Sequence, residues 1–121
     1  MLAHVSLQCD DLAASAAFYD ALLATLGGGR IMEHDDAIGY GRDGSPTFWI
    51  SRAADPGPGR QVHVAFVASS PADVDAFHVA AVARGDEVLH GPRLWPEYYA
   101  GYYATFVRDP GGNNVEAVHY G

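Results

Sequence analysis

The sequence repeats itself at an offset of 59 residues, and this feature limits the folds open to the chain more than any other. A repeat of this length is one supersecondary unit that shares a core with its copy. We therefore predict two modules, of about residues 1–59 and 60–121, which together form a single domain. The matching pairs are His4 and His63, Val5 and Val64, Ala17 and Ala76, Phe18 and Phe77, Ala21 and Ala80, and Ala24 and Ala83.

Each half predicts the same order of elements: one strand, one helix and three more strands. Alternating apolar and polar residues predict the strands, and apolar residues at helical spacing predict the helices. A capping aspartate, Asp10 or Asp11, precedes the first helix, and Ser70 precedes the second. The fold class is therefore α+β. The predicted elements are strand 2–9, a helix to about 26, strands 30–35, 37–42 and 47–52, then strand 61–68, a helix to about 84, and strands 87–93, 102–108 and 115–120.

The last two strands form a hairpin with a carboxylate in its middle. Residues 109–113 are Asp-Pro-Gly-Gly-Asn, a run of strong turn formers. A five-residue loop there sets Arg108 opposite Asn114, and therefore Phe106 opposite Glu116 on one face of the hairpin. A buried carboxylate must be paired, hydrogen-bonded or bound to a metal. The role of Glu116 is therefore the central question of the sequence.

Charge and cysteine content exclude several classes of function. The net charge is −8, and all seven positive residues are arginines, which argues against nucleic-acid binding. The single cysteine, Cys9, rules out an intramolecular disulfide and a Cys-based zinc site, and we expect it to be buried in the core. No apolar run is long enough to span a membrane, and no signal peptide precedes the first strand, so we expect a cytoplasmic protein with no membrane partner.

Two histidines and one carboxylate form a candidate metal site. Strand alternation places His4, His63 and Glu116 on the faces opposite the residues that pack on the helices, and the repeat makes the two histidines equivalent. Two His and one carboxylate leave coordination positions open for water or substrate. Each residue also has an ordinary alternative: a strand histidine often forms surface hydrogen bonds, and Glu116 could be solvated or pair with an arginine such as Arg93.

The chain resembles the vicinal oxygen chelate superfamily, which includes glyoxalase I, the extradiol dioxygenases, and the fosfomycin- and bleomycin-resistance proteins. The resemblance extends over essentially the whole chain, and its most specific motifs lie within 11–19 and 101–116. It implies that the strands curl into a cup with the helices outside. It also implies a divalent metal inside the cup (zinc, nickel, manganese or iron) and a homodimer.

The sequence departs from two chemistries of that superfamily. Metal sites of the glyoxalase I type take a further carboxylate from the last strand of the first module, but residues 47–50 are Thr-Phe-Trp-Ile. Extradiol dioxygenases place a tyrosine ten residues before the Glu ligand, and here that residue is Phe106. Glu97 is a candidate for the missing base, provided that its loop folds over the cup.

Aromatic residues are candidates for the walls of a small-molecule site. We expect Trp49 or Phe48, together with Phe106 and Tyr102, to contact the substrate. Tyr99 lies in a loop at the rim that also carries Trp95 and Tyr98, and that loop is a candidate for a lid or a dimer contact.

The preferred interpretation is a metal-dependent lyase or isomerase of the glyoxalase-like kind. His4, His63 and Glu116 would hold the cation, with Glu116 also the catalytic residue, and the substrate would be small and oxygen-chelating. One alternative is a protein that binds an aromatic or antibiotic-like molecule without turnover, as bleomycin-resistance proteins do. A second alternative is a ring-cleaving dioxygenase.

Overall fold

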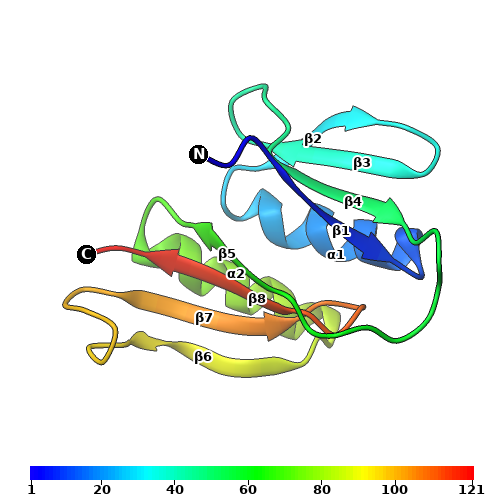
Figure 1. The fold of residues 1–121 in the computed structure, drawn as a ribbon. Coiled ribbons are helices and arrows are strands. Elements are labelled where there is room, and N and C mark those ends of the chain that lie inside the picture. The colour runs from blue at the N-terminus through cyan, green and yellow to red at the C-terminus, as the bar shows by residue number, and fades with distance from the viewer. The chain divides into compact units, whose positions relative to one another are not determined.

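The chain consists of two compact units, each with one helix and one four-stranded sheet (Figure 1). They are described here from a computed structural model that covers all 121 residues, and the units are Met1–Gly59 and Arg60–Gly121. No helix of either unit combines the length and the apolar character needed to cross a bilayer.

The first unit has a mixed sheet with the strand order β1-β4-β3-β2. β1 runs parallel to β4, and the remaining pairs are antiparallel. The elements are β1 (Val5–Cys9), α1 (Leu12–Ala24), β2 (Gly29–Glu33), β3 (Ala37–Gly41) and β4 (Phe48–Arg52).

Aromatic packing and a capped helix hold this unit together. The Asp11 carboxylate accepts a hydrogen bond from the Ala14 amide and so caps α1. Phe18 and Tyr19 of α1 are fully buried, and the Tyr19 ring lies 4.8 Å from that of Phe48 in β4. Cys9 is buried on β1, as expected for a core residue.

The second unit repeats this plan with the strand order β5-β8-β7-β6, and β5 is again parallel to its neighbour. Its helix begins after Ser70, whose hydroxyl accepts from the Asp73 amide, and ends at Gly85, whose φ of 81° favours glycine. The elements are β5 (His63–Val67), α2 (Pro71–Arg84), β6 (Val88–Leu94), β7 (Tyr103–Arg108) and β8 (Asn114–His119).

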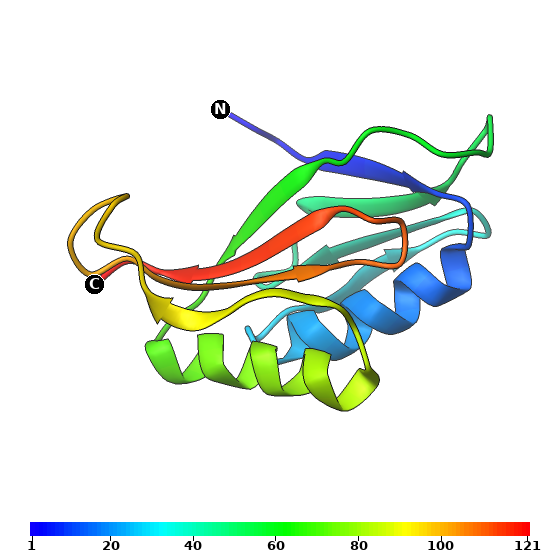
Figure 2. The same ribbon diagram turned by 90° about the horizontal axis from the view of Figure 1, so that it is seen from below.

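The two faces of the sheet in the second unit are covered differently: α2 lies on one, and an aromatic cluster covers part of the other. α2 packs against β6, β7 and β8 along one face (Figure 2), where Val74, Phe77 and Ala81 are fully buried. On the other face, Trp95 joins Phe106 and its strand neighbours in a separate buried cluster. Glu116 lies on this second face, because it is directly opposite Phe106 in the β7–β8 pair.

The predicted α+β class and the β-α-β-β-β order of each half are confirmed. The first strand is shorter than predicted, because β1 begins at Val5 and leaves His4 immediately before it. Val5 is the first residue of β1 with a partner: it pairs with Phe48, and its amide donates to the Thr47 carbonyl. In this parallel register His4 would face Thr47, which lies before β4 begins at Phe48, so the ladder ends at Val5.

Candidate functional site

The β7–β8 hairpin sets the position of Glu116. Phe106 pairs with Glu116 and Arg108 with Asn114, so the register predicted from the loop length is confirmed. The turn is fixed by the Asp109 carboxylate, which accepts hydrogen bonds from the amides of Gly111 at 3.0 Å and Asn113 at 2.8 Å. Since the side chains of a strand alternate, Asn114 and Glu116 point to the same face of β8.

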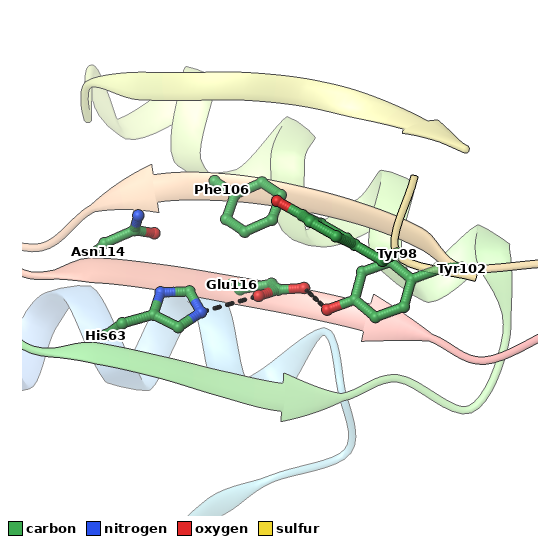
Figure 3. A pocket seen from close by; sticks show the side chains of 6 residues that line it. All are labelled: His63, Tyr98, Tyr102, Phe106, Asn114 and Glu116. Carbon is green, nitrogen blue, oxygen red and sulfur yellow. Dashed lines mark hydrogen bonds and ion pairs between the residues drawn. The ribbon is translucent and has the colours of Figure 1, made fainter. Parts of the chain in front are cut away.

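Both oxygens of the Glu116 carboxylate are bound by side chains. The residue is only 2% exposed, so an unpaired charge there would be costly. Its Oε1 lies 2.9 Å from Nε2 of His63, which comes from β5, and its Oε2 accepts a hydrogen bond from the Tyr102 hydroxyl (Figure 3). A basic ring and a phenol therefore compensate the burial of this carboxylate, and no arginine is involved.

The three side chains open onto a pocket of about 360 Å³ within the second unit. Its lining divides into a polar part and an aromatic part (Figure 3). The His63 ring also stacks on that of Phe106, with centroids 6.0 Å apart, so the two parts are in contact. A pocket that combines aromatic walls with a few convergent polar groups is typical of a small-molecule site. The polar residues are His63, Asn114 and Glu116, and the aromatic residues are Tyr98, Tyr102 and Phe106.

The Tyr102 hydroxyl is a protonated donor at this site. Burial raises the pKa of Tyr102 above its ordinary value, and the hydrogen bond to Glu116 raises that pKa further. Because the phenol stays protonated over the physiological range, Tyr102 donates and the carboxylate accepts.

The segment 95–102, here called the aromatic loop, forms one end of the pocket. Trp95 and Tyr98 stack almost parallel, 5.6 Å between centroids, and Tyr98 meets the Tyr102 ring edge to face. Tyr99 packs against Tyr102 and Tyr120 and does not line the pocket. The aromatic loop therefore presents Tyr98 and Tyr102 to the pocket and turns Tyr99 away from it.

Glu97 is engaged elsewhere. Its carboxylate pairs with the Arg93 guanidinium at 3.1 Å, and that hydrogen bond lowers the pKa of Glu97. Arg93 in turn lies over the Trp95 ring, 3.3 Å from its centroid. Glu97 does not line the pocket, so the structure gives it no contact with the group that a base would serve.

The equivalent position of the first unit carries Trp49. Ser6 pairs with Trp49 in the first sheet as Ala65 pairs with Glu116 in the second, and the 59-residue offset places Ser6 on Ala65. Trp49 lies over Gly39 and stacks on His34 with centroids 6.0 Å apart. A tryptophan ring thus occupies the place of the carboxylate, and the neighbouring Phe48 belongs to the core.

The His63–Glu116 pair has the spacing of two adjacent metal ligands. Octahedral ligands about 2.1 Å from a divalent ion lie about 3 Å apart; the 2.9 Å hydrogen bond between Nε2 and Oε1 has the same separation. The structure contains no group of three or more His, Cys, Asp or Glu side chains that could hold a metal. His4 belongs to the first unit, where it is exposed. The residues of the second unit therefore fit part of a metal site.

Four of the residues predicted from sequence meet in the second unit: His63, Tyr102, Phe106 and Glu116. Trp49 and His4 lie in the first unit. Asn114 was not predicted as a site residue, and Tyr98 was named only as a member of the rim loop. Asn114 had a detectable signal, because it precedes Glu116 by two residues on the same strand face. The direction of the Tyr98 side chain could not be predicted, since it depends on the conformation of the aromatic loop.

Comparison with known proteins places the chain in a family. A model of the Glyoxalase/Bleomycin resistance protein/Dioxygenase superfamily matches residues 1–117. A search of curated proteins gives no match.

Solved structures agree with this assignment. A glyoxalase/bleomycin resistance protein from Albidiferax ferrireducens is 33% identical, with a TM-score of 0.83 and 96% of each chain covered. A lactoylglutathione lyase from Agrobacterium tumefaciens is 26% identical, with a TM-score of 0.71 and coverage of 96% of this chain and 90% of that one. A glyoxalase-related enzyme from Fulvimarina pelagi, 22% identical, has the same fold, with a TM-score of 0.73 over 98% of this chain and 87% of that one. The chain therefore belongs to the Glyoxalase/Bleomycin resistance protein/Dioxygenase superfamily.

Proposed function

We propose that the pocket of the second unit is the active site of a divalent-metal-dependent lyase or isomerase that acts on a small, oxygen-bearing substrate. The observation that carries this proposal is the 2.9 Å approach of His63 Nε2 to the buried Glu116 carboxylate. A lactoylglutathione lyase is among the similar structures, which favours glyoxalase-like chemistry. The proposed metal ligands are His63, Glu116 and, as the repeat equivalent of His63, His4.

The proposed ligand set suits zinc, nickel, manganese or iron, since imidazole and carboxylate donors bind each of these ions. A divalent cation bound there would polarise the oxygen atoms of a substrate. Around it, Tyr102 holds the Glu116 carboxylate in place, and the rings of Tyr98 and Phe106 keep water from the apolar part of the substrate. Glu116 is the one carboxylate that lines the pocket, so we assign to it any proton transfer at this site.

The alternative is a protein that binds an aromatic or antibiotic-like molecule without converting it. Trp49 supports this alternative. It holds in the first unit the position of Glu116 in the second, so the first unit supplies no equivalent carboxylate. In that case His63 and Glu116 would serve as hydrogen-bonding groups for the bound molecule. A ring-cleaving dioxygenase has less support, since Phe106 has no hydroxyl to offer a substrate.

Metal analysis of protein purified without chelator tests the proposal. We expect about one divalent ion per chain, lost in His63→Ala and retained in His34→Ala, a histidine whose ring stacks on Trp49 in the first unit. An activity screen on 2-oxoaldehyde–thiol adducts and on catechols then separates lyase or isomerase chemistry from ring cleavage. If no metal is retained at any loading, the binding protein becomes the better interpretation.

The proposal extends to the assembly and setting of the protein. We propose that the two units act as modules of one domain, because the family model extends across both. We further propose a homodimer in the cytoplasm with a small molecule as its partner and no membrane partner. The net charge of −8 argues against a nucleic-acid partner. Sedimentation or light scattering would measure the oligomeric state.

A further inference from the structure

The Glu116 carboxylate is connected to the C-terminal end of the chain through one tyrosine. The Tyr102 hydroxyl donates to Glu116 Oε2, and the Tyr102 ring is packed edge to face against three other tyrosines. The centroid separations from these rings are 5.0 Å to Tyr98, 5.3 Å to Tyr99 and 5.7 Å to Tyr120. Tyr99 and Tyr120 also stack on each other at 5.6 Å, so these rings form one cluster behind the carboxylate.

We propose that Tyr102 is a positioning residue that fixes the orientation of the Glu116 carboxylate, and that Tyr99 and Tyr120 act on the site through Tyr102. This inference rests on the proposed function only in taking Glu116 as the functional carboxylate. Held at Oε2, the carboxylate keeps Oε1 directed at His63. Residues that hydrogen-bond a metal-binding side chain and fix its orientation commonly determine how tightly the metal binds.

The backbone explains why these tyrosines meet. Tyr103 pairs with His119 at the end of the antiparallel β7–β8 ladder. Tyr102 and Tyr120 are the next residue on each strand beyond this last pair. The Trp95 amide donates to the Tyr102 carbonyl at 2.7 Å and closes the aromatic loop. Gly101 has a φ of 82°, and a Cβ there would lie 2.8 Å from the Gly121 Cα, so only glycine allows this close approach.

The hydroxyl is the important group of Tyr102, and the ring is the important group of Tyr120. At Tyr102 the hydroxyl carries the effect, because it makes the bond to Glu116, and Tyr102→Phe keeps the ring contacts while removing that bond. At Tyr120 the ring carries the effect, so Tyr120→Phe should behave as the wild type and Tyr120→Ala should not. An unspecific loss of packing would not produce this opposite dependence on the hydroxyl.

Metal-free protein labelled with [ζ-¹³C]tyrosine gives the first test. Tyr102→Phe identifies the Tyr102 resonance by its disappearance. We expect Glu116→Gln and Tyr120→Ala each to shift that resonance, and Tyr120→Phe to leave it in place. Tyr103 is an internal control, because its hydroxyl donates to Asp75 at 2.6 Å on α2 and its resonance should not move in Glu116→Gln.

Titration with Zn²⁺ gives the second test. We expect Tyr102→Phe to weaken zinc binding by about 10- to 100-fold, Tyr120→Ala to weaken it less, and the double variant to match Tyr102→Phe alone, since Tyr120 acts through the same hydroxyl. A Tyr102 resonance unmoved by Glu116→Gln, or wild-type zinc affinity in Tyr102→Phe, would overturn the positioning role. If the Tyr102 resonance shifts in Glu116→Gln but neither the wild type nor any variant binds zinc, the proposed metal site is wrong and the positioning role of Tyr102 stands.

Discussion

Trp49 occupies in the first unit the strand position that Glu116 occupies in the second. Each residue stands at the same place in its parallel strand pair, opposite Ser6 and Ala65 respectively. The residue across the antiparallel pair differs as well, being Gly39 in the first unit and Phe106 in the second. The two units therefore share a backbone plan while only the second places a carboxylate at this position.

The exchange of Phe106 for Gly39 has a steric reason. A Cβ added at Gly39 would lie 2.8 Å from two atoms of the Trp49 ring and 2.9 Å from Pro46 Cβ. The φ of Gly39 is not positive, so the restriction is space and not backbone conformation. The large ring on β4 thus requires the smallest residue opposite it on β3.

Gly39→Ala should therefore destabilise the protein by about 1–3 kcal/mol, the usual cost of overpacking. Urea unfolding would measure the change. Gly29→Ala is the matched control, because its Cβ would meet no atom within 4 Å. Adding Trp49→Ala to Gly39→Ala should cost less than the sum of the two single changes, and full additivity would show that the ring is not the obstacle.

Local patterns predicted the elements and the β7–β8 register because alternation and turn formers act over a few residues. They could not predict that the Tyr102 hydroxyl binds Glu116, since that contact depends on how the aromatic loop closes. For the same reason they could not predict that Tyr99 packs against Tyr120, and a contact between Tyr99 and the substrate stays a prediction. The first residue of β1 was also predicted wrongly, because the start of this strand depends on where its partner β4 begins.

Acid should weaken a contact between the helix and the sheet of the first unit. Hydrogen bonds from Arg30 and Tyr40 to the Asp20 carboxylate, at 2.9 Å each, lower its pKa in the folded protein. A lowered carboxylate pKa stabilises the fold above the unfolded value of about 3.8, and this contribution is lost as the pH falls through the folded pKa. Because the pair is partly exposed, we expect its contribution to be below about 1 kcal/mol.

Asp20→Asn should therefore lower the free energy of unfolding at pH 7, and its difference from the wild type should shrink below about pH 4. Urea unfolding at pH 7 and pH 3 would measure both values. Asp55→Asn, in an exposed loop, is the control and should show little difference at either pH. A destabilisation that persists unchanged at pH 3 would contradict the role given to the charge.

Glu97→Ala should leave the activity of the protein within about twofold of the wild type, whichever substrate the screen identifies. Glu97 is paired with Arg93, its pKa is lowered, and it does not line the pocket. Because the Glu97–Arg93 pair is exposed to solvent, its loss should change the stability of the fold little. Steady-state kinetics would decide, and a large loss of kcat with an unchanged KM would restore Glu97 as a base.

Glu116→Gln should separate stability from metal binding. An amide has nearly the same shape as a carboxylate, so its oxygen can accept from the Tyr102 hydroxyl and its NH₂ can donate to His63. The free energy of unfolding should therefore change by less than about 1 kcal/mol, whereas Glu116→Ala leaves the Tyr102 hydroxyl without its acceptor and should cost about 1–3 kcal/mol.

Metal affinity, unlike stability, should fall strongly in Glu116→Gln. The neutral amide lacks the negative charge with which Glu116 would attract a divalent cation, so we expect Glu116→Gln to bind metal at least about 100-fold more weakly although it is folded. Calorimetry with Zn²⁺ and urea unfolding of the same samples would measure the two effects. Equal metal affinity in the wild type and Glu116→Gln would mean that this carboxylate is held for the hydrogen bonds it makes and not for a metal.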